Sequence, residues 1–350
     1  MKKINSIIKR LTRTPLFLPI VCLFLVLLVN LIQTPSFFKI TIQNGVFYGY
    51  IIDIINRSSG LIILTVGMTL VAASSGGADI SVGAVSALCG AVCVAALGTG
   101  DVYQMPYVVS LLFAILVGMT CGMFNGFLVS YMKVQPMVAT LILFTAGRGI
   151  AQLVTGSFIL YVKPEQFGYL GAFIPGVPIP TPCFVAVFVV LFTWLVLKKT
   201  SLGMYIQSVG INRKASGLIG LNSKLIMLFT YVFCGLCAAG AGLISVSRTM
   251  SIDANNVGLY TELDAILAVA IGGNSLSGGK FSLIGSVIGA ITIQALTTTL
   301  YAMHVSADQI PLYKAVVVII IVAMQSPAVR KWFDNLKLKI SLSHPVKEVG

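Results

Sequence analysis

Apolar runs of about 20 residues, the length that crosses the hydrocarbon core of a bilayer as a helix, recur along most of the chain. Only 9% of the 350 residues are charged and 57% are hydrophobic, whereas a soluble domain carries about 25% charged residues. The chain cannot cover itself with a polar surface, so the sequence predicts an all-α, polytopic membrane protein with about ten transmembrane helices. The predicted spans are approximately residues 16–32, 58–74, 82–97, 107–131, 137–160, 184–197, 225–245, 263–274, 283–301 and 312–324.

Basic residues gather in three segments, and their positions predict the orientation. Five precede the first span, five lie between the sixth and seventh spans, and five follow the last span. Because positive residues mark cytoplasmic loops, we expect 1–15, 198–224 and 326–350 to be cytoplasmic, with both termini inside. The first span lacks a small-residue cleavage site, which indicates an uncleaved anchor. We therefore expect a single transmembrane domain over 1–350. The basic residues behind the net charge of +13 set the topology and do not form a nucleic-acid-binding patch.

The segment "AIGGNSLSGGKFSLIGS", which begins at Ala270, has the glycine density of a phosphate-binding loop. Such a loop follows the pattern G-x-x-x-x-G-K-[ST]. Lys280 follows a glycine as required, but Asn274 and Phe281 occupy the positions of the first glycine and of the hydroxyl. The sequence therefore argues against a nucleotide site. We expect the glycines to permit a tight cytoplasmic turn and close helix packing.

Cysteine and histidine residues offer no candidate metal site. Cys234 and Cys237 form a C-x-x-C within an apolar run, and zinc would need a second pair of ligands. The two histidines, His304 and His344, have no ligand-forming neighbours in the sequence. No metal, cofactor or catalytic residue is predicted.

Four polar residues in or beside the spans are candidates for a substrate pathway. Thr145, Arg148 and Gln152 fall on one face of a helix. A charge in mid-membrane usually faces a partner or a water-filled cavity. Arg148 is equally well explained as a structural residue that a carboxylate or helix-end carbonyls hold. Asp79, in a glycine-flanked turn, either contacts the substrate or caps the next helix.

Five segments carry a family resemblance that covers almost the whole chain. They are "GMTLVAASSGGADISVGAVSAL" (Gly67–Leu88), "CGMFNGFLVSYMKVQPMVATL" (Cys121–Leu141), "GINRKASGLIGLN" (Gly210–Asn222), "TELDAILAVAIGGNSLSGGKFSLIGSVIGA" (Thr261–Ala290) and "YKAVVVIIIV" (Tyr313–Val322). With these segments the chain resembles the membrane-spanning permease of ABC importers, in the branch that takes up ribose, galactose, arabinose, xylose and related monosaccharides. Within that branch it is most similar to the galactofuranose permeases.

The resemblance implies that the chain carries a monosaccharide across a bacterial cell membrane without an ATPase site of its own. The implied partners are two ATP-binding domains on the cytoplasmic face, a second permease subunit that is the same or a related chain, and an extracytoplasmic sugar-binding protein, all in or beside membrane lipid. The resemblance does not identify the sugar.

The loop Thr200–Lys224 is the most informative polar segment. Propensity predicts a short helix from about Arg213 to Ile219, with an N-cap before it and a glycine after it. By the resemblance this loop carries the coupling helix that docks on the ATPase; the alternative is a basic anchor without a partner. The candidate coupling residues are Gly210, Asn212, Arg213, Lys214, Ala215, Gly217 and Gly220.

Two other functional classes stay open from the residues alone. A secondary sugar or nucleoside transporter, driven by an ion gradient, would use carboxylates buried in the bundle. The candidates are Asp79, Glu262 and Asp264, which lie near predicted span ends. A membrane enzyme would need a cluster of His, Asp, Glu or Ser near the interface.

Overall fold

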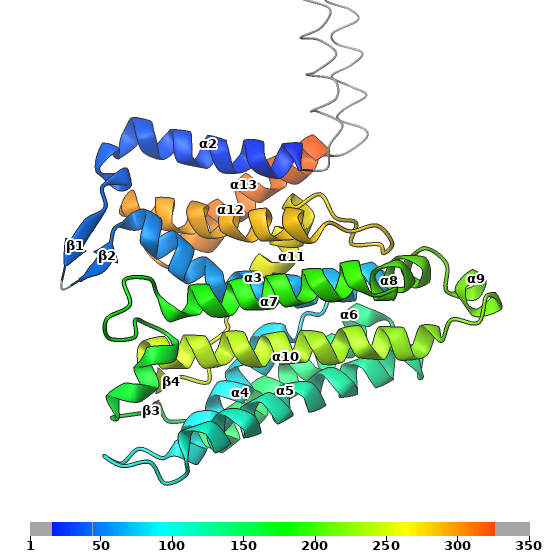
Figure 1. The fold of residues 1–350 in the computed structure, drawn as a ribbon, viewed down its shortest axis with the longest axis horizontal. Coiled ribbons are helices and arrows are strands. Elements are labelled where there is room, and N and C mark those ends of the chain that lie inside the picture. The colour runs from blue at the N-terminus through cyan, green and yellow to red at the C-terminus, as the bar shows by residue number, and fades with distance from the viewer. Residues whose placement is uncertain (1–15, 44, 326–350) are drawn as a thin grey trace, which may run out of the picture.

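A computed structural model describes residues 16–43 and 45–325, which form a bundle of helices with roughly aligned axes (Figure 1). Two pairs of short antiparallel strands lie at one end, which we call the β-strand end, and α8 and α9 lie at the opposite end, which we call the α9 end. The helices are α2 (Phe17–Gln33), α3 (Tyr50–Ser75), α4 (Val82–Leu97), α5 (Tyr107–Ser130), α6 (Pro136–Thr155), α7 (Thr181–Lys199), α8 (Leu202–Ile211), α9 (Arg213–Leu218), α10 (Ser223–Thr249), α11 (Thr261–Ile271), α12 (Leu283–Ala302) and α13 (Ile310–Gln325). The strands are β1 (Thr41–Gln43), β2 (Val46–Tyr48), β3 (Leu160–Tyr161) and β4 (Ser251–Ile252), and the short 3-10 helices are η1 (Pro35–Phe38) and η2 (Glu165–Leu170).

Local sequence signals set several helix boundaries. The side chain of Asn212 accepts the N–H of Ala215 at 3.1 Å and begins α9, as an N-cap residue does. Asn222 caps α10 in the same way. At the other end of a helix, Gly76 takes a left-handed φ of 67° and terminates α3. The short helix predicted after Asn212 is therefore confirmed.

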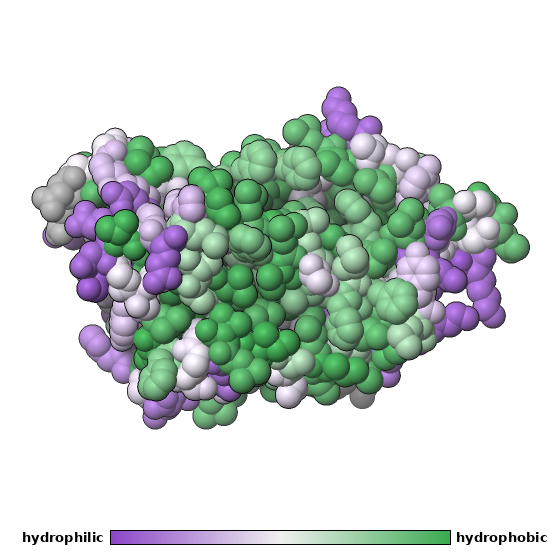
Figure 2. All heavy atoms as spheres, turned by 90° about the horizontal axis from the view of Figure 1, so that it is seen from below, coloured by the Kyte–Doolittle hydropathy of each residue, from purple (hydrophilic) through white to green (hydrophobic). Residues whose placement is uncertain are grey.

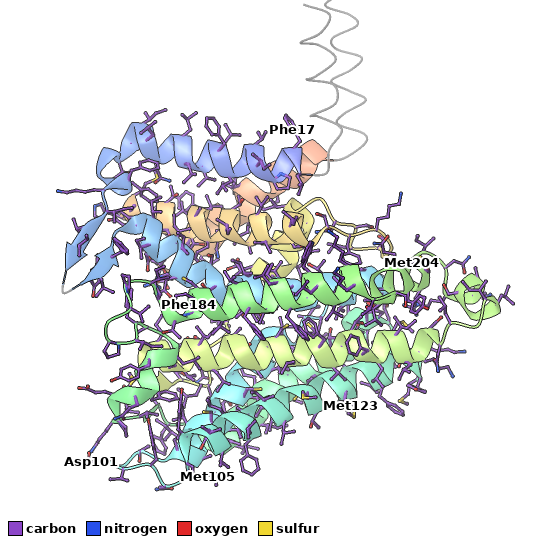
Figure 3. The ribbon with its side chains drawn as sticks, viewed as in Figure 1. Phe17, Asp101, Met105, Met123, Phe184 and Met204 are labelled. Carbon is purple, nitrogen blue, oxygen red and sulfur yellow. The ribbon has the colours of Figure 1, made fainter. Side chains whose placement is uncertain are left out.

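Helix α3 forms the centre of the bundle. Its most apolar stretch is 94% buried, against α7, α10, α11 and α12. The apolar stretches of α5, α6 and α7 are only 22–28% buried. Met123 of α5 and Phe184 of α7 (Figure 3) are 53% and 52% exposed. Figure 2 shows hydrophobic residues across the middle of one face and hydrophilic residues at both ends, an arrangement that suits a bilayer.

A helix lies at each of the ten predicted ranges, so the all-α fold is confirmed. Within the described residues, six helices are long and apolar enough to cross a membrane, whereas α2, α4, α11 and α13 are shorter. The number of crossings therefore stays a prediction. The sequence missed α8, and it ended α6 five residues too late, because Gly156 with φ 62° stops that helix. The predicted cytoplasmic segments 1–15 and 326–350 lie outside the described residues.

Helix α11 begins inside the bundle. After α10 the chain forms β4, which pairs with β3 at the β-strand end, and then turns back between the helices. Gly258 packs directly on the backbone of Gly83, where a Cβ would overlap the Gly83 carbonyl oxygen. Glu262, in the first turn of α11, is only 3% exposed. The predicted position of Glu262 near a span end is correct, but its side chain is buried, whereas Tyr260 and Leu263 beside it are about half exposed.

Candidate functional site

A wide cavity of about 530 Å³ opens at the β-strand end, between the β1–β2 hairpin, the start of α3 and the loop before α7. Its wall combines aromatic rings with polar groups. Tyr48 and Phe173 have ring centroids 6.1 Å apart, and Asp53, Asn56 and Arg57 project from the first turns of α3. A site of this composition offers an apolar surface and a few orienting hydrogen bonds, as small-molecule sites usually do.

A narrow cavity of about 140 Å³ lies next to it, among α3, α10, α11 and α12. Arg57 lines both cavities, so the two are neighbours that share one side chain. The polar residues of the narrow cavity include Arg248, Thr261, Asp264 and Gln294. Ionisable residues within a membrane bundle are costly and usually mark a route or a partner, which makes this cavity the strongest site candidate in the described chain.

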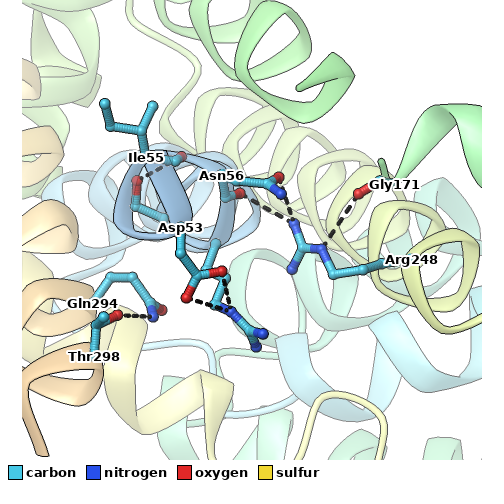
Figure 4. Close-up of polar contacts among 9 residues, drawn as sticks. Asp53, Ile55, Asn56, Gly171, Arg248, Gln294 and Thr298 are labelled. Atoms are coloured by element: carbon cyan, nitrogen blue, oxygen red, sulfur yellow. Dashed lines mark hydrogen bonds and ion pairs between the residues drawn. The ribbon is translucent and has the colours of Figure 1, made fainter. Parts of the chain in front are cut away.

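Hydrogen bonds hold the two arginines in place (Figure 4). Arg57 Nε donates to the Asp53 carboxylate at 2.7 and 2.9 Å, and both side chains are about half exposed. Arg248 Nη2 donates to the backbone carbonyl and the side-chain oxygen of Asn56, each at 3.1 Å. The first turns of α3 thus orient both guanidinium groups beside the cavities.

An ion pair joins α11 to α13 at the narrow cavity. Lys314 Nζ lies 2.8 and 2.7 Å from the Asp264 carboxylate oxygens, and the side chains are only 13% and 20% exposed. The sequence interpretation singled out Asp264 but missed Lys314, Arg57, Arg248 and Gln294. A lone lysine within the last apolar run was a signal for Lys314.

Two of the three predicted pathway residues of α6, Arg148 and Gln152, hold the loop before α11. Arg148 Nη1 donates to the carbonyls of Ala254, Asn255 and Val257 at 2.8–2.9 Å. Gln152 bonds to the Asn255 side chain. The geometry therefore favours the structural alternative for Arg148, although the carbonyls that hold it belong to the loop before α11 and not to a helix end. Thr145 is exposed and bonds to the Leu141 carbonyl of its own helix.

Asp79 organises the turn between α3 and α4. It is 2% exposed, and its Oδ1 accepts the N–H of Ser81 at 2.9 Å and the Ser81 hydroxyl at 2.6 Å. This contact lies directly before α4, whose N-cap is Ser81 and makes no side-chain cap bond, so Asp79 holds the turn and does not cap the helix as the alternative reading expected. Asp79 and the three α6 residues are not among the lining residues of the two cavities in the described chain. A direct pathway role for these four residues stays a prediction.

The predicted coupling residues lie at the α9 end, where α9 projects from the bundle (Figure 1). Most of them are exposed, and a Cβ on Gly217 or Gly220 would meet no described atom within 4 Å. Leu218 and Ile219 are 89% and 74% exposed. Gly210 differs, because it packs against the backbone of α3. The short helix and the residues after it thus expose small, basic and apolar groups at the α9 end.

Comparison with known proteins identifies the family. The family model described as branched-chain amino acid transport system / permease component matches residues 50–325. The chain belongs to this permease family. It is 44% identical over 321 residues to the galactofuranose transporter permease protein YtfT of Escherichia coli (91% of this chain, 92% of the relative). It is 36% identical over 354 residues to the fructose import permease protein FruF of Bifidobacterium longum (99% and 97%) and 36% identical over 307 residues to the ribose import permease protein RbsC of E. coli (86% and 91%).

The family resemblance predicted from the sequence is confirmed. No solved structure matches the chain. Together with the six long apolar helices among residues 16–43 and 45–325, the family makes the chain a multi-pass transport component of the bacterial inner membrane.

Proposed function

We propose that this chain is the permease subunit of an ATP-driven importer for a monosaccharide, with a galactofuranose-like sugar as the first candidate. The observation that carries the proposal is the 44% identity, over 91% of the chain, to the galactofuranose transporter permease. Relatives named for fructose and ribose import support the wider class of monosaccharides.

The sugar enters through the wide cavity and passes Arg57 into the narrow one. A sugar hydroxyl both donates and accepts hydrogen bonds. The guanidinium groups of Arg57 and Arg248 supply donors, and the carboxylates of Asp53 and Asp264 supply acceptors. The aromatic rings of the wide cavity suit the apolar faces of a sugar ring. This mixed lining fits a neutral polyhydroxylated ligand, which needs no counter-ion.

Three of the four residues predicted on the pathway contribute by positioning it, and Thr145 bonds, among the described contacts, only within its own helix. Arg148 and Gln152 hold the loop that leads into α11, and α11 carries Asp264 to the narrow cavity. Asp79 fixes the turn between α3 and α4. Each of these residues acts on the route through the loop or turn that it holds.

Partner proteins supply the energy and deliver the substrate. Two ATP-binding domains dock on α9 within the cytoplasmic loop 198–224, a second permease subunit completes the membrane unit, and an extracytoplasmic sugar-binding protein delivers the sugar. The segments 1–15 and 326–350 are cytoplasmic in this arrangement, within one domain over 1–350. The chain itself hydrolyses no ATP, because Asn274 and Phe281 occupy the positions that a phosphate loop requires.

A second candidate is a secondary transporter driven by an ion gradient. The observation that favours it is the burial of carboxylates: Glu262 is 3% exposed, and the side chain of Asp264 is 20% exposed. Such groups can carry protons or cations in gradient-driven transporters. The pairing of Asp264 with Lys314 neutralises one of them and favours the ATP-driven importer.

The test is uptake by vesicles that contain the chain with its ATPase and sugar-binding partners. Labelled galactofuranose, galactose, ribose and fructose are compared with leucine, with ATP or a non-hydrolysable analogue on the α9 side. The proposal predicts uptake of at least one sugar that requires ATP hydrolysis and survives ionophores. Uptake that persists without ATP and collapses with an ionophore would favour the secondary transporter, and uptake of leucine alone would exclude sugar as the substrate.

A further inference from the structure

Three segments interlock through backbone atoms at the α9 end. They are the last turn of α3, the last turn of α8, and the loop of residues 272–282 between α11 and α12, which we call the glycine loop. The N–H of Gly279 donates to the Ala73 carbonyl at 2.9 Å. A Cβ on Gly210 would overlap that carbonyl oxygen and lie 2.6 Å from the Gly279 nitrogen. The contact therefore leaves no space for a side chain at position 210.

Arg213 adds a direct link from α9 to α3. It is the first residue of α9, and its Nη2 donates to the carbonyl of Ser75, the last residue of α3. The last carbonyls of a helix have no partner within the helix, so this bond satisfies a group that would otherwise need another donor. A displacement of α9 acts directly on the end of α3.

Asn274 fastens the glycine loop to α3 at a second level. Its side-chain amide donates to the Val269 carbonyl at 3.2 Å and to the Ser286 hydroxyl at 2.7 Å. The Ser286 hydroxyl lies 2.6 Å from the hydroxyl of Thr69 on α3. Both Ser286 and Thr69 are almost fully buried. Asn274, which does not fit the phosphate-loop pattern, therefore connects the glycine loop to α12 and, through Ser286, to α3.

Two of the joined elements reach the narrow cavity at their opposite ends. Arg57 lies 18 residues before Ser75 in α3, or about 27 Å along the axis at about 1.5 Å per residue. Thr261 and Asp264 lie at the start of α11, whose other end leads into the glycine loop. The cavity walls and the junction are thus opposite ends of the same helices.

We propose that Arg213 and the glycine loop transmit the movement of α9 to the narrow cavity through α3 and α11. The inference rests on the proposed function, because the ATP-binding partner moves α9. A helix moves as a rigid element, so a shift or tilt imposed at its end reaches the cavity wall. Arg213 is in this scheme a positioning residue that acts through α3.

The test compares Arg213→Met with Lys214→Met in the complete complex. Lys214 is the next residue of α9 and carries the same charge, but no described hydrogen bond joins it to α3. Its replacement therefore removes one positive charge from α9 and leaves the bond between Arg213 and Ser75 in place. The cavity is read by Ser245→Cys in each background, because Ser245 lines the narrow cavity. The measurements are membrane abundance, copurification of the ATPase, uptake, and the rate at which an impermeant maleimide labels the introduced cysteine with and without trapped ATP.

We expect the parent complex to change its labelling rate at least fivefold on ATP trapping. Lys214→Met, which can weaken docking of the ATPase on α9 but removes no bond to α3, should show the same fold change in every complex that retains its ATPase. Arg213→Met should keep its abundance and its ATPase, lose the ATP-dependent change, and fall at least tenfold in uptake per complex, and Arg213→Lys should recover part of both. If ATP trapping changes the labelling rate of Arg213→Met as much as that of the parent complex, the proposal is overturned. Loss of abundance in both Arg213→Met and Arg213→Gln, with Lys214→Met normal, would reduce Arg213 to a helix cap and also overturn it. If ATP changes neither the labelling rate nor the uptake of the parent complex, the proposed function is overturned and this inference with it.

Discussion

The two ends of α3 meet their neighbours in different ways. At the β-strand end, Asp53, Asn56 and Arg57 project side chains toward two cavities. At the α9 end, Ala73 and Ser75 contact other segments through backbone carbonyls, in a junction where Gly210 has no room for a side chain. A site lined by side chains changes its chemistry when one is replaced, whereas a backbone junction fails when a side chain is added. The first arrangement suits ligand selection, and the second suits the transmission of force.

The largest expected effect is that of Gly210→Val. Its side chain would overlap the Ala73 carbonyl and displace the Gly279 hydrogen bond. Overpacking usually costs about 1–3 kcal/mol, and backbone obstacles cannot rotate away, so folded abundance should fall at least roughly tenfold. The measurement is the monodisperse fraction after detergent extraction.

Gly217→Trp is the matched control for that variant, because a Cβ at position 217 meets no described atom within 4 Å. It should be extracted at the parental level. Equal abundance of the two variants would mean that the junction at Gly210 is looser than described.

Breaking the ion pair between α11 and α13 should have the next largest effect. Asp264→Asn leaves Lys314, whose side chain is 13% exposed, without its carboxylate. Removal of one partner of a buried pair costs roughly 3–5 kcal/mol, and the partial exposure of this pair places it near the lower limit. The midpoint of thermal inactivation in detergent should therefore fall clearly.

The double variant Asp264→Asn with Lys314→Met removes both charges and should recover most of the lost stability. If it is no more stable than Asp264→Asn, the pair does not hold α11 against α13.

The smallest expected effect is that of Thr145→Val. The side chain is exposed on α6 and its hydroxyl bonds only to the Leu141 carbonyl among the described contacts. Stability should stay within about 0.5 kcal/mol of the parent and uptake within about twofold. A tenfold loss of uptake at normal abundance would instead place α6 directly on the sugar route.

Hydropathy predicted where the helices lie, because lipid-facing helices must be apolar over their length. It failed at the residues that line the cavities. The sequence placed the second span at 58–74, whereas α3 begins at Tyr50. The missing turns contain Asp53 and Arg57, whose charges lower the hydropathy of any window that includes them. Two charges close together at one helix end, such as these, are thus excluded by the criterion that finds the helices, whereas Asp264, a single charge in the narrow cavity, fell inside a predicted span.

The α9 end was predictable only in part. The cap at Asn212 and the short helix follow from local propensity, and the structure has both. The contact of Gly210 with Ala73 and the bond of Arg213 to Ser75 join residues that are far apart in the sequence. Such contacts depend on tertiary packing. The failed phosphate-loop pattern excluded one explanation of the glycines but did not reveal their structural partners.

The central claim is that the β-strand end selects the sugar and the α9 end transmits the work of ATP. The most direct measurement is uptake as a function of sugar concentration, with ATP hydrolysis in the same vesicles, for Arg57→Gln and Gly217→Trp. Loss of a charge-assisted hydrogen bond costs roughly 1.5–3 kcal/mol, so Arg57→Gln should raise the half-saturating sugar concentration at least about tenfold and leave basal hydrolysis unchanged. Gly217→Trp should leave that concentration unchanged and lower both the maximal uptake and the sugar-stimulated hydrolysis at least tenfold. If both variants change the same parameter, the division of labour between the two ends is wrong.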